Sequence, residues 1–259
     1  MAYGKHMQLG LNSFHMRTAY REQLNRLTHD LLIMGDLVRN TMELASTSLL
    51  EVDLAKAEKV VSSIDSIEEL RAKCEAAAFE LLALEGPVAS DLRQVVSGIY
   101  IVEELARMAA LSVHVAKLAR RRHPQAAIPE EIKPYVKEMA QQAVNSASKI
   151  KDVLVTADVA QAMKLAEDDD AVDDIHRHLF ILTTQREWKY STREAVDLTL
   201  VSRYLERYSD HAVDIASRVV YMVTGMRLPE YQEAERTKEQ QQALESQFNE
   251  ISRRYSDNW

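Results

Sequence analysis

The stretch "LERYSDHAVDIA", residues 205–216, and the stretch "LARMAALSVHVA", residues 105–116, repeat one another at an offset of 100 residues. The identical positions are Leu105/Leu205, Arg107/Arg207, Val113/Val213 and Ala116/Ala216. A second pair, "DLAKAEK" at 53–59 and "DVAQAMK" at 158–164, repeats at an offset of 105 residues. A period near 100 residues is too long for a solenoid unit, so the pattern indicates a duplicated domain.

Composition indicates which kind of domain is duplicated. The 259 residues include only 6 Gly and 5 Pro, whereas Ala, Leu, Glu and the other good helix formers abound. Apolar residues recur at three- and four-residue spacing, and the breaks fall at "LEGPVAS", "RHPQAAIPEE" and "REWKYST". The expected helices cover residues 17–49, 53–84, 88–122, 130–156, 158–187 and 191–226. We therefore predict an all-α fold of two tandem antiparallel three-helix bundles with a C-terminal helical tail.

The predicted boundaries divide the chain into four parts. Residues 1–15 resemble an expression tag without regular structure, because "KHM" and two glycines precede Met16. Residues 16–123 form the first bundle and 124–228 the second. Residues 229–259 are strongly polar with a short apolar seam, which is typical either of a helix that contacts a partner or of a solvated tail.

Charge and hydropathy limit the classes of function. The net charge is −8 and the isoelectric point is near 5.6, which argues against binding nucleic acid through phosphate contacts. The single basic run, Arg120 to His123, fits either an anion or membrane-surface patch or favourable cations at a helix C-terminus. No stretch is apolar enough to span a membrane or to act as a signal peptide, so we expect a cytoplasmic protein without membrane insertion.

Acidic residues mark one hairpin of the second repeat. If the hairpin turn is centred near residues 189–190, Asp169 lies level with Asp210 and Asp173 lies level with Glu206. The geometry predicts four carboxylates at one depth between two helices. The equivalent positions of the first repeat are Ile64, Glu68, Ala106 and Ala110, so that bundle keeps the fold pattern but lacks most of the acids.

Four neighbouring carboxylates repel one another unless cations neutralise them. Oxygen ligands of this kind suit magnesium, manganese or iron, and zinc is possible. The alternatives are that the acids pair with Arg203 and Arg207 or that they face solvent. His176 and His211 are weaker candidate ligands, because His211 follows Asp210 and points to another side of the helix.

Two longer stretches resemble a known family. "YLERYSDHAVDIASRVVYMVTG" (204–225) and "LLALEGPVASDLRQVV" (81–96), together with the duplicated six-helix plan, are similar to the PhoU family over residues 16–226. The resemblance implies two tandem three-helix bundles and a homodimer. It also implies multinuclear iron or zinc clusters on E/D-x-x-x-D motifs, which match Asp169/Asp173 and Glu206/Asp210.

The resemblance further implies signalling rather than catalysis. It indicates a negative regulator of phosphate uptake and phosphate-starvation signalling, an adaptor between a Pst-type ABC phosphate importer and a sensor histidine kinase. The expected partners are the kinase and the importer's ATPase. Two other functions stay open from the residues: a carboxylate-bridged di-metal oxidase, and a purely structural dimer with solvated acids. No nucleophile or nucleotide motif is present, so we predict that the protein is not an enzyme.

Overall fold

The computed structural model describes residues 3–85, 89–167 and 170–256, and the side chains within residues 18–83, 89–166 and 171–249. The regular structure of these residues is entirely helical, which confirms the predicted fold class. The helices are α1 (Tyr3–Glu51), α2 (Leu54–Ser62), α3 (Ile64–Glu85), α4 (Ala89–Arg122), α5 (Lys133–Thr156), α6 (Val159–Glu167), α7 (Asp170–Thr184), α8 (Thr192–Thr224) and α9 (Leu228–Ser256).

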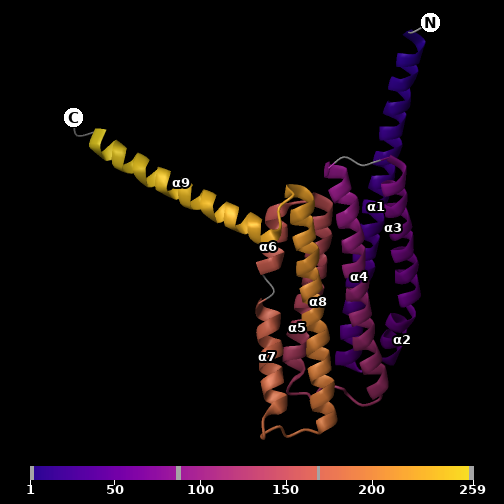
Figure 1. The fold of residues 1–259 in the computed structure, drawn as a ribbon. Helices are drawn as coiled ribbons and strands as arrows, with labels where there is room; N and C mark the ends of the chain where they lie inside the picture. Colours follow the sequence, from indigo (N-terminus) through magenta and orange to yellow (C-terminus); the bar gives the residue numbers. More distant parts are fainter. Residues whose placement is uncertain (1–2, 86–88, 168–169, 257–259) are drawn as a thin grey trace.

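The helices form two antiparallel bundles that lie side by side (Figure 1). The first bundle contains α1, the pair α2 and α3, and α4. The second contains α5, the pair α6 and α7, and α8. The bundles meet where α4 packs against α8 and α1 packs against α5, and their buried apolar side chains form one continuous core. The predicted division at residues 123/124 falls in the connection between α4 and α5.

The contact between α4 and α8, called the inter-bundle seam below, joins the two copies of the repeat in antiparallel order. Residues late in α4 meet residues early in α8: the guanidinium of Arg121 lies 2.8 Å from the carboxylate of Asp197. Near the middle, the rings of His114 and Tyr204 stack with centroids 5.2 Å apart. The two copies are therefore related by an approximate two-fold axis across the seam.

Two predicted helices are each divided in the structure. The expected helix 53–84 is interrupted after Ser62, because the Ser63 amide donates to the Val60 carbonyl in a tighter turn. The hydroxyls of Ser62 and Ser63 also donate to carbonyls of the preceding turn, which competes with regular helix hydrogen bonding. The expected helix 158–187 is likewise two helices, α6 and α7, with residues 168–169 between them outside the described residues.

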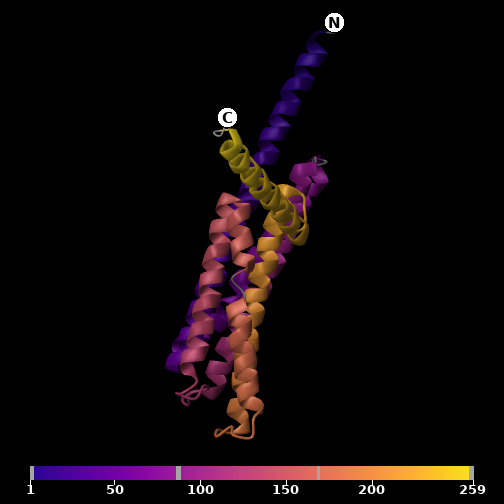
Figure 2. The same cartoon turned by 90° about the vertical axis from the view of Figure 1, so that its left-hand side faces the viewer.

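The ends of α8 and the course of α9 complete the fold. Ser191 and Glu194 form a reciprocal capping box at the start of α8, and Gly225, with a φ of 75°, ends it in the left-handed conformation. Figures 1 and 2 show α9 leaving the bundles as a single projecting helix. Its apolar side chains Leu244 and Phe248 are 68% and 69% exposed. Helix α1 begins at Tyr3, earlier than the predicted residue 17, since no proline stops it before that position.

Within the described residues, no helix has the length and apolar character needed to cross a membrane.

Candidate functional site

Helices α7 and α8 bring three of the four predicted acids together. Carboxylate oxygens of Asp173, Glu206 and Asp210 all lie within 4.8 Å of one another, and this group is called the carboxylate cluster. Glu206 and Asp210 share one side of α8 because they are four residues apart. Asp173 reaches them from α7. The fourth predicted ligand, Asp169, lies outside the described residues.

Burial leaves the carboxylate cluster short of hydrogen-bond donors. Glu206 is only 9% exposed, and its Oε2 is buried without a partner in the described structure. Oδ1 of Asp173 is likewise buried and unpartnered. Arg203 donates to Oε1 of Glu206, so the predicted alternative of arginine pairing satisfies one oxygen of the cluster. Two buried carboxylate oxygens without donors are what a cation site requires.

The same arrangement raises the pKa of two acids. Burial raises the pKa of Glu206 above its usual value, and the neighbouring Asp210 and Asp173 raise it further while Arg203 opposes them. Burial also raises the pKa of Asp210, and Asp173 adds to the effect. A bound cation would remove this strain between like charges, because it stabilises the ionised form of each acid.

The two histidines named from the sequence occupy different places. Nδ1 of His176 lies 3.0 Å from the Ser202 hydroxyl. Burial lowers the pKa of His176, which favours a neutral imidazole. His211 faces the inter-bundle seam instead, where its Nδ1 lies 2.7 Å from Oε2 of Glu104 on α4. The ligand atoms of the described carboxylate cluster include no imidazole nitrogen.

The equivalent place in the first bundle has a different chemistry. Ala106 is buried where the second bundle has Glu206. The acid that remains there, Glu68, pairs with Arg71 at 3.2 Å, and Arg71 also pairs with Glu103 at 2.8 Å. Here each acid has a cationic partner, so this region is an ion-pair network and lacks the unpartnered oxygens of the second bundle.

A second group at the seam was not found from the sequence. Ligand atoms of Glu104, His211 and Asp214 also lie within 4.8 Å of one another. Asp214 is exposed and contributes to the wall of a pocket between α4 and α8. This group joins residues of both bundles, and sequence spacing within one repeat carries no information about such pairs.

Comparison with known proteins identifies the relatives of the chain. A model of the PhoU domain matches residues 31–119 and 136–219. The phosphate-specific transport system accessory protein PhoU homolog 2 of Mycobacterium bovis is 49% identical over 210 residues, which cover 81% of this chain and 99% of that protein.

Two crystal structures resemble the fold. PhoU from Pseudomonas aeruginosa matches with a TM-score of 0.72 and 25% identity, covering 80% of this chain and 100% of that one. The phosphate transport system regulatory protein PhoU from Streptococcus pneumoniae matches with a TM-score of 0.74 and 23% identity, covering 81% and 99% of the two chains.

Proposed function

The chain belongs to the PhoU family, and from that premise we propose that it is a negative regulator of phosphate uptake and phosphate-starvation signalling. A role in regulating phosphate transport follows from its similarity to phosphate-specific transport accessory proteins over nearly their whole length. The finer proposal is a cytoplasmic adaptor that contacts a sensor histidine kinase and the ATPase of a Pst-type importer. Preferential binding to one state of each partner would shift that partner toward inactivity. The proposal assigns no catalytic reaction to the chain.

A deletion in the organism that encodes the chain tests the regulatory role. With phosphate plentiful, a reporter of phosphate-starvation transcription should be active in the deletion strain and silent again when the wild-type chain is restored. Normal repression in the deletion strain, together with no binding of purified chain to kinase or ATPase, would exclude the adaptor.

Exposed apolar side chains on α7 offer a variant for the binding assay. Phe180 and Ile181 are 51% and 46% exposed and adjacent in the chain, so together they form a small apolar surface that a partner could cover. We expect serine at both positions to weaken capture of a partner while leaving the unfolding temperature unchanged. Phe79→Ser on α3 is the matched control, because Phe79 is also exposed, at 67%, but lies in the first bundle.

We also propose that the carboxylate cluster binds iron or zinc, with Asp173, Glu206 and Asp210 as ligands and Asp169 as the expected fourth. The unpartnered buried oxygens of Asp173 and Glu206 support this proposal. A bound cation would hold α7 against α8 by neutralising their acids. The ligand set of described carboxylates favours a cation with this holding role over a di-metal oxidase, which typically uses histidine as well.

Metal analysis of purified protein tests the carboxylate cluster. The variant Asp173→Asn with Asp210→Asn should lose the iron or zinc that the wild-type chain carries. Asp174→Asn is the matched control, because Asp174 is 72% exposed and pairs with Arg177 outside the cluster. Equal metal content in wild type and the double variant would refute the assignment.

The family resemblance also leads us to propose a homodimer. Light scattering on the purified chain should give twice the chain mass of 29.5 kDa, and a monomer at micromolar concentration would contradict this proposal.

A further inference from the structure

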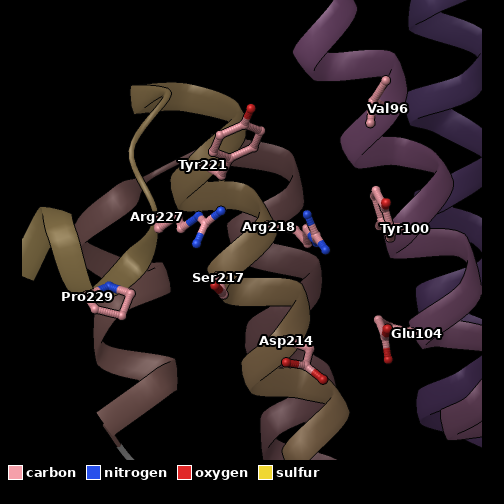
Figure 3. A pocket seen from close by; sticks show the side chains of 9 residues that line it. All are labelled: Val96, Tyr100, Glu104, Asp214, Ser217, Arg218, Tyr221, Arg227 and Pro229. Atoms are coloured by element: carbon pink, nitrogen blue, oxygen red, sulfur yellow. The ribbon is translucent and has the colours of Figure 1, made fainter.

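A pocket of about 640 Å³ opens at one end of the inter-bundle seam. Its walls come from α4, from the last turns of α8 and from the start of α9, and its lining residues include Tyr100, Ser217, Arg218, Tyr221 and Arg227. Figure 3 shows the guanidinium groups of Arg218 and Arg227 at a similar level of the pocket, with Tyr221 above them. The pocket therefore combines two cations with several hydroxyl groups.

No carboxylate forms an ion pair with the guanidinium of Arg218 or Arg227 within the described part of the chain, although Glu230 accepts a hydrogen bond from the backbone amide of Arg227 at 3.1 Å. Arg218 lies over the ring of Tyr100, with its guanidinium carbon 3.8 Å from the ring centroid. Such stacking fixes the plane of the guanidinium while leaving its N–H groups free to donate.

Two further polar groups behind this end of the seam lack partners. Nε of Arg93 and Oγ of Ser97, one turn apart on α4, are buried without a hydrogen-bond partner in the described structure. Arg93 also lies beside the end of α8, since its guanidinium carbon is 3.6 Å from where a Cβ on Gly225 would be. The guanidinium groups of Arg93, Arg218 and Arg227 therefore gather at this end of the seam, whereas the acids of the pocket, Glu104 and Asp214, lie toward its other end (Figure 3).

The internal repeat allows the two ends of the inter-bundle seam to be compared residue by residue. At the opposite end of the seam, Asp197 accepts a hydrogen bond from Arg121 at 2.8 Å and forms an ion pair with Arg122 at 3.1 Å, beside Arg193 in a similar pocket. At the offset of 100 residues Arg93 corresponds to Arg193, but Ser97 stands where the second repeat has Asp197. One end of the seam therefore has a buried carboxylate, and Ser97 replaces it at the other end. The cations differ as well, because Arg121 and Arg122 correspond to Tyr221 and Met222, so Arg218 and Arg227 are additions of the second repeat.

We propose that this pocket binds an oxyanion of the phosphate class, held by Arg218 and Arg227. Both side chains suit bidentate recognition of phosphoryl oxygens, and the hydroxyls of Ser217 and Tyr221 are within the same pocket wall. The oxyanion is either free phosphate or the phosphoryl group of a larger molecule.

Two carboxylates at the other end of the pocket limit the affinity. Figure 3 shows Asp214 and Glu104 facing one another below the arginines. Glu104 is paired with His211 at 2.7 Å and with Arg107 at 3.3 Å, whereas Asp214 has no ion-pair partner among the described residues. Asp214 therefore repels the anion, and removing its charge should strengthen binding.

Calorimetric titration of the full-length chain with inorganic phosphate, and separately with adenosine monophosphate, tests the pocket. Arg218→Gln and Arg227→Gln should each weaken binding by about tenfold, the loss of one charge-assisted contact. Asp214→Asn should tighten it. Arg207→Gln on the exposed side of α8 removes the same charge outside the pocket and should change nothing.

Each outcome of these titrations either supports or overturns the proposed oxyanion site. Saturable phosphate binding with this order of variants supports a site for free phosphate, and binding of the monophosphate alone supports a larger phosphorylated ligand. Binding of neither probe to folded wild-type protein, or equal losses in Arg207→Gln and Arg218→Gln, overturns the proposal. The assay uses only purified protein, so its failure leaves the regulatory role standing, and failure of the genetic test leaves the pocket standing.

Discussion

Asp210 is an acid of the carboxylate cluster that forms no ion pair among the described residues. Arg203, the nearby cation, contacts Glu206 instead. The pKa of Asp210 is raised, first by burial and then by Asp173. A raised pKa in an acid means that the ionised form destabilises the folded state, so the cost is absent when the acid is protonated and grows as pH rises.

We expect Asp210→Asn to stabilise the metal-free protein at neutral pH by about 0.5–1 kcal/mol. The gain should fall as pH drops and vanish below about pH 3, where the wild-type acid is protonated in both the folded and the unfolded states. Urea unfolding in the presence of a chelator, repeated between about pH 3 and 8, measures the difference. A gain that stays constant with pH would show that charge is not its cause.

Single residues of the carboxylate cluster were predictable, and those of the seam were not. Hairpin register gives the depth of each side chain along α7 and α8, and spacing of four gives the shared face, so Asp173, Glu206 and Asp210 followed from the sequence. The pairing of His211 with Glu104 depends on how two bundles dock. Periodicity within one helix says only that His211 points away from Asp210.

The expected helix 191–226 agrees with α8 to within two residues at each end. The structure shows that Ser191 and Gly225 cap it. The break between α2 and α3 was missed because Ser62 and Ser63 are tolerated inside helices. Their competing hydrogen bonds to the preceding carbonyls depend on local geometry that spacing alone does not reveal.

The capping box of α8 offers a prediction at the scale of one element. Ser191→Ala removes the side-chain oxygen that accepts from the Glu194 amide at 3.3 Å. We expect a loss of about 1 kcal/mol, seen as a fall of about 2–4 °C in the thermal midpoint. Thr47→Ala within α1 is the control, because the half-buried Thr47 donates a solvent-exposed hydrogen bond to the Glu43 carbonyl of its own helix and caps no helix end. If both substitutions lowered the thermal midpoint equally, the loss at Ser191 could not be attributed to the capping box.

The projecting helix α9 allows a prediction about the stability of the whole molecule. Leu228 and Tyr231, near its start, pack on the core, whereas its later residues Leu244 and Phe248 are largely exposed. We expect a chain that ends at Glu235 to unfold within about 0.5 kcal/mol of the full chain, since little buried surface is lost. Guanidinium unfolding measures this, and a large loss would mean that the distal helix is covered in solution.

The arrangement of the two bundles relative to one another could not be predicted from the sequence. The repeat predicts each three-helix unit, because both copies carry the same apolar pattern, but nothing in that pattern says which faces of the copies meet. The run Arg120 to His123 illustrates the difference. Its three arginines lie in the last turn of α4, which agrees with the expected cations at a helix C-terminus, but the sequence did not indicate that two of them form the inter-bundle contact with Asp197.

Asp197→Ala tests whether that contact joins the bundles energetically. The Asp197 side chain is 3% exposed and that of Arg122 is 9% exposed, so the substitution leaves a buried cation without its partner. Breaking a buried pair in this way costs about 3–5 kcal/mol. The matched control is Glu58→Ala, whose partner is the adjacent Arg120 at 3.3 Å, because both of those side chains are about half exposed.

Surface pairs of that kind contribute about 0–1 kcal/mol, so the two substitutions should differ by several-fold in chemical denaturation. Hydrogen exchange locates the effect: loss of Asp197 should increase exchange at the ends of α4 and α8 that meet at the Asp197 contact, in both bundles together. If only the second bundle loses protection, the bundles unfold independently and the ion pair does not couple them. If both do, the duplicated halves behave as one cooperative unit, as their continuous core requires.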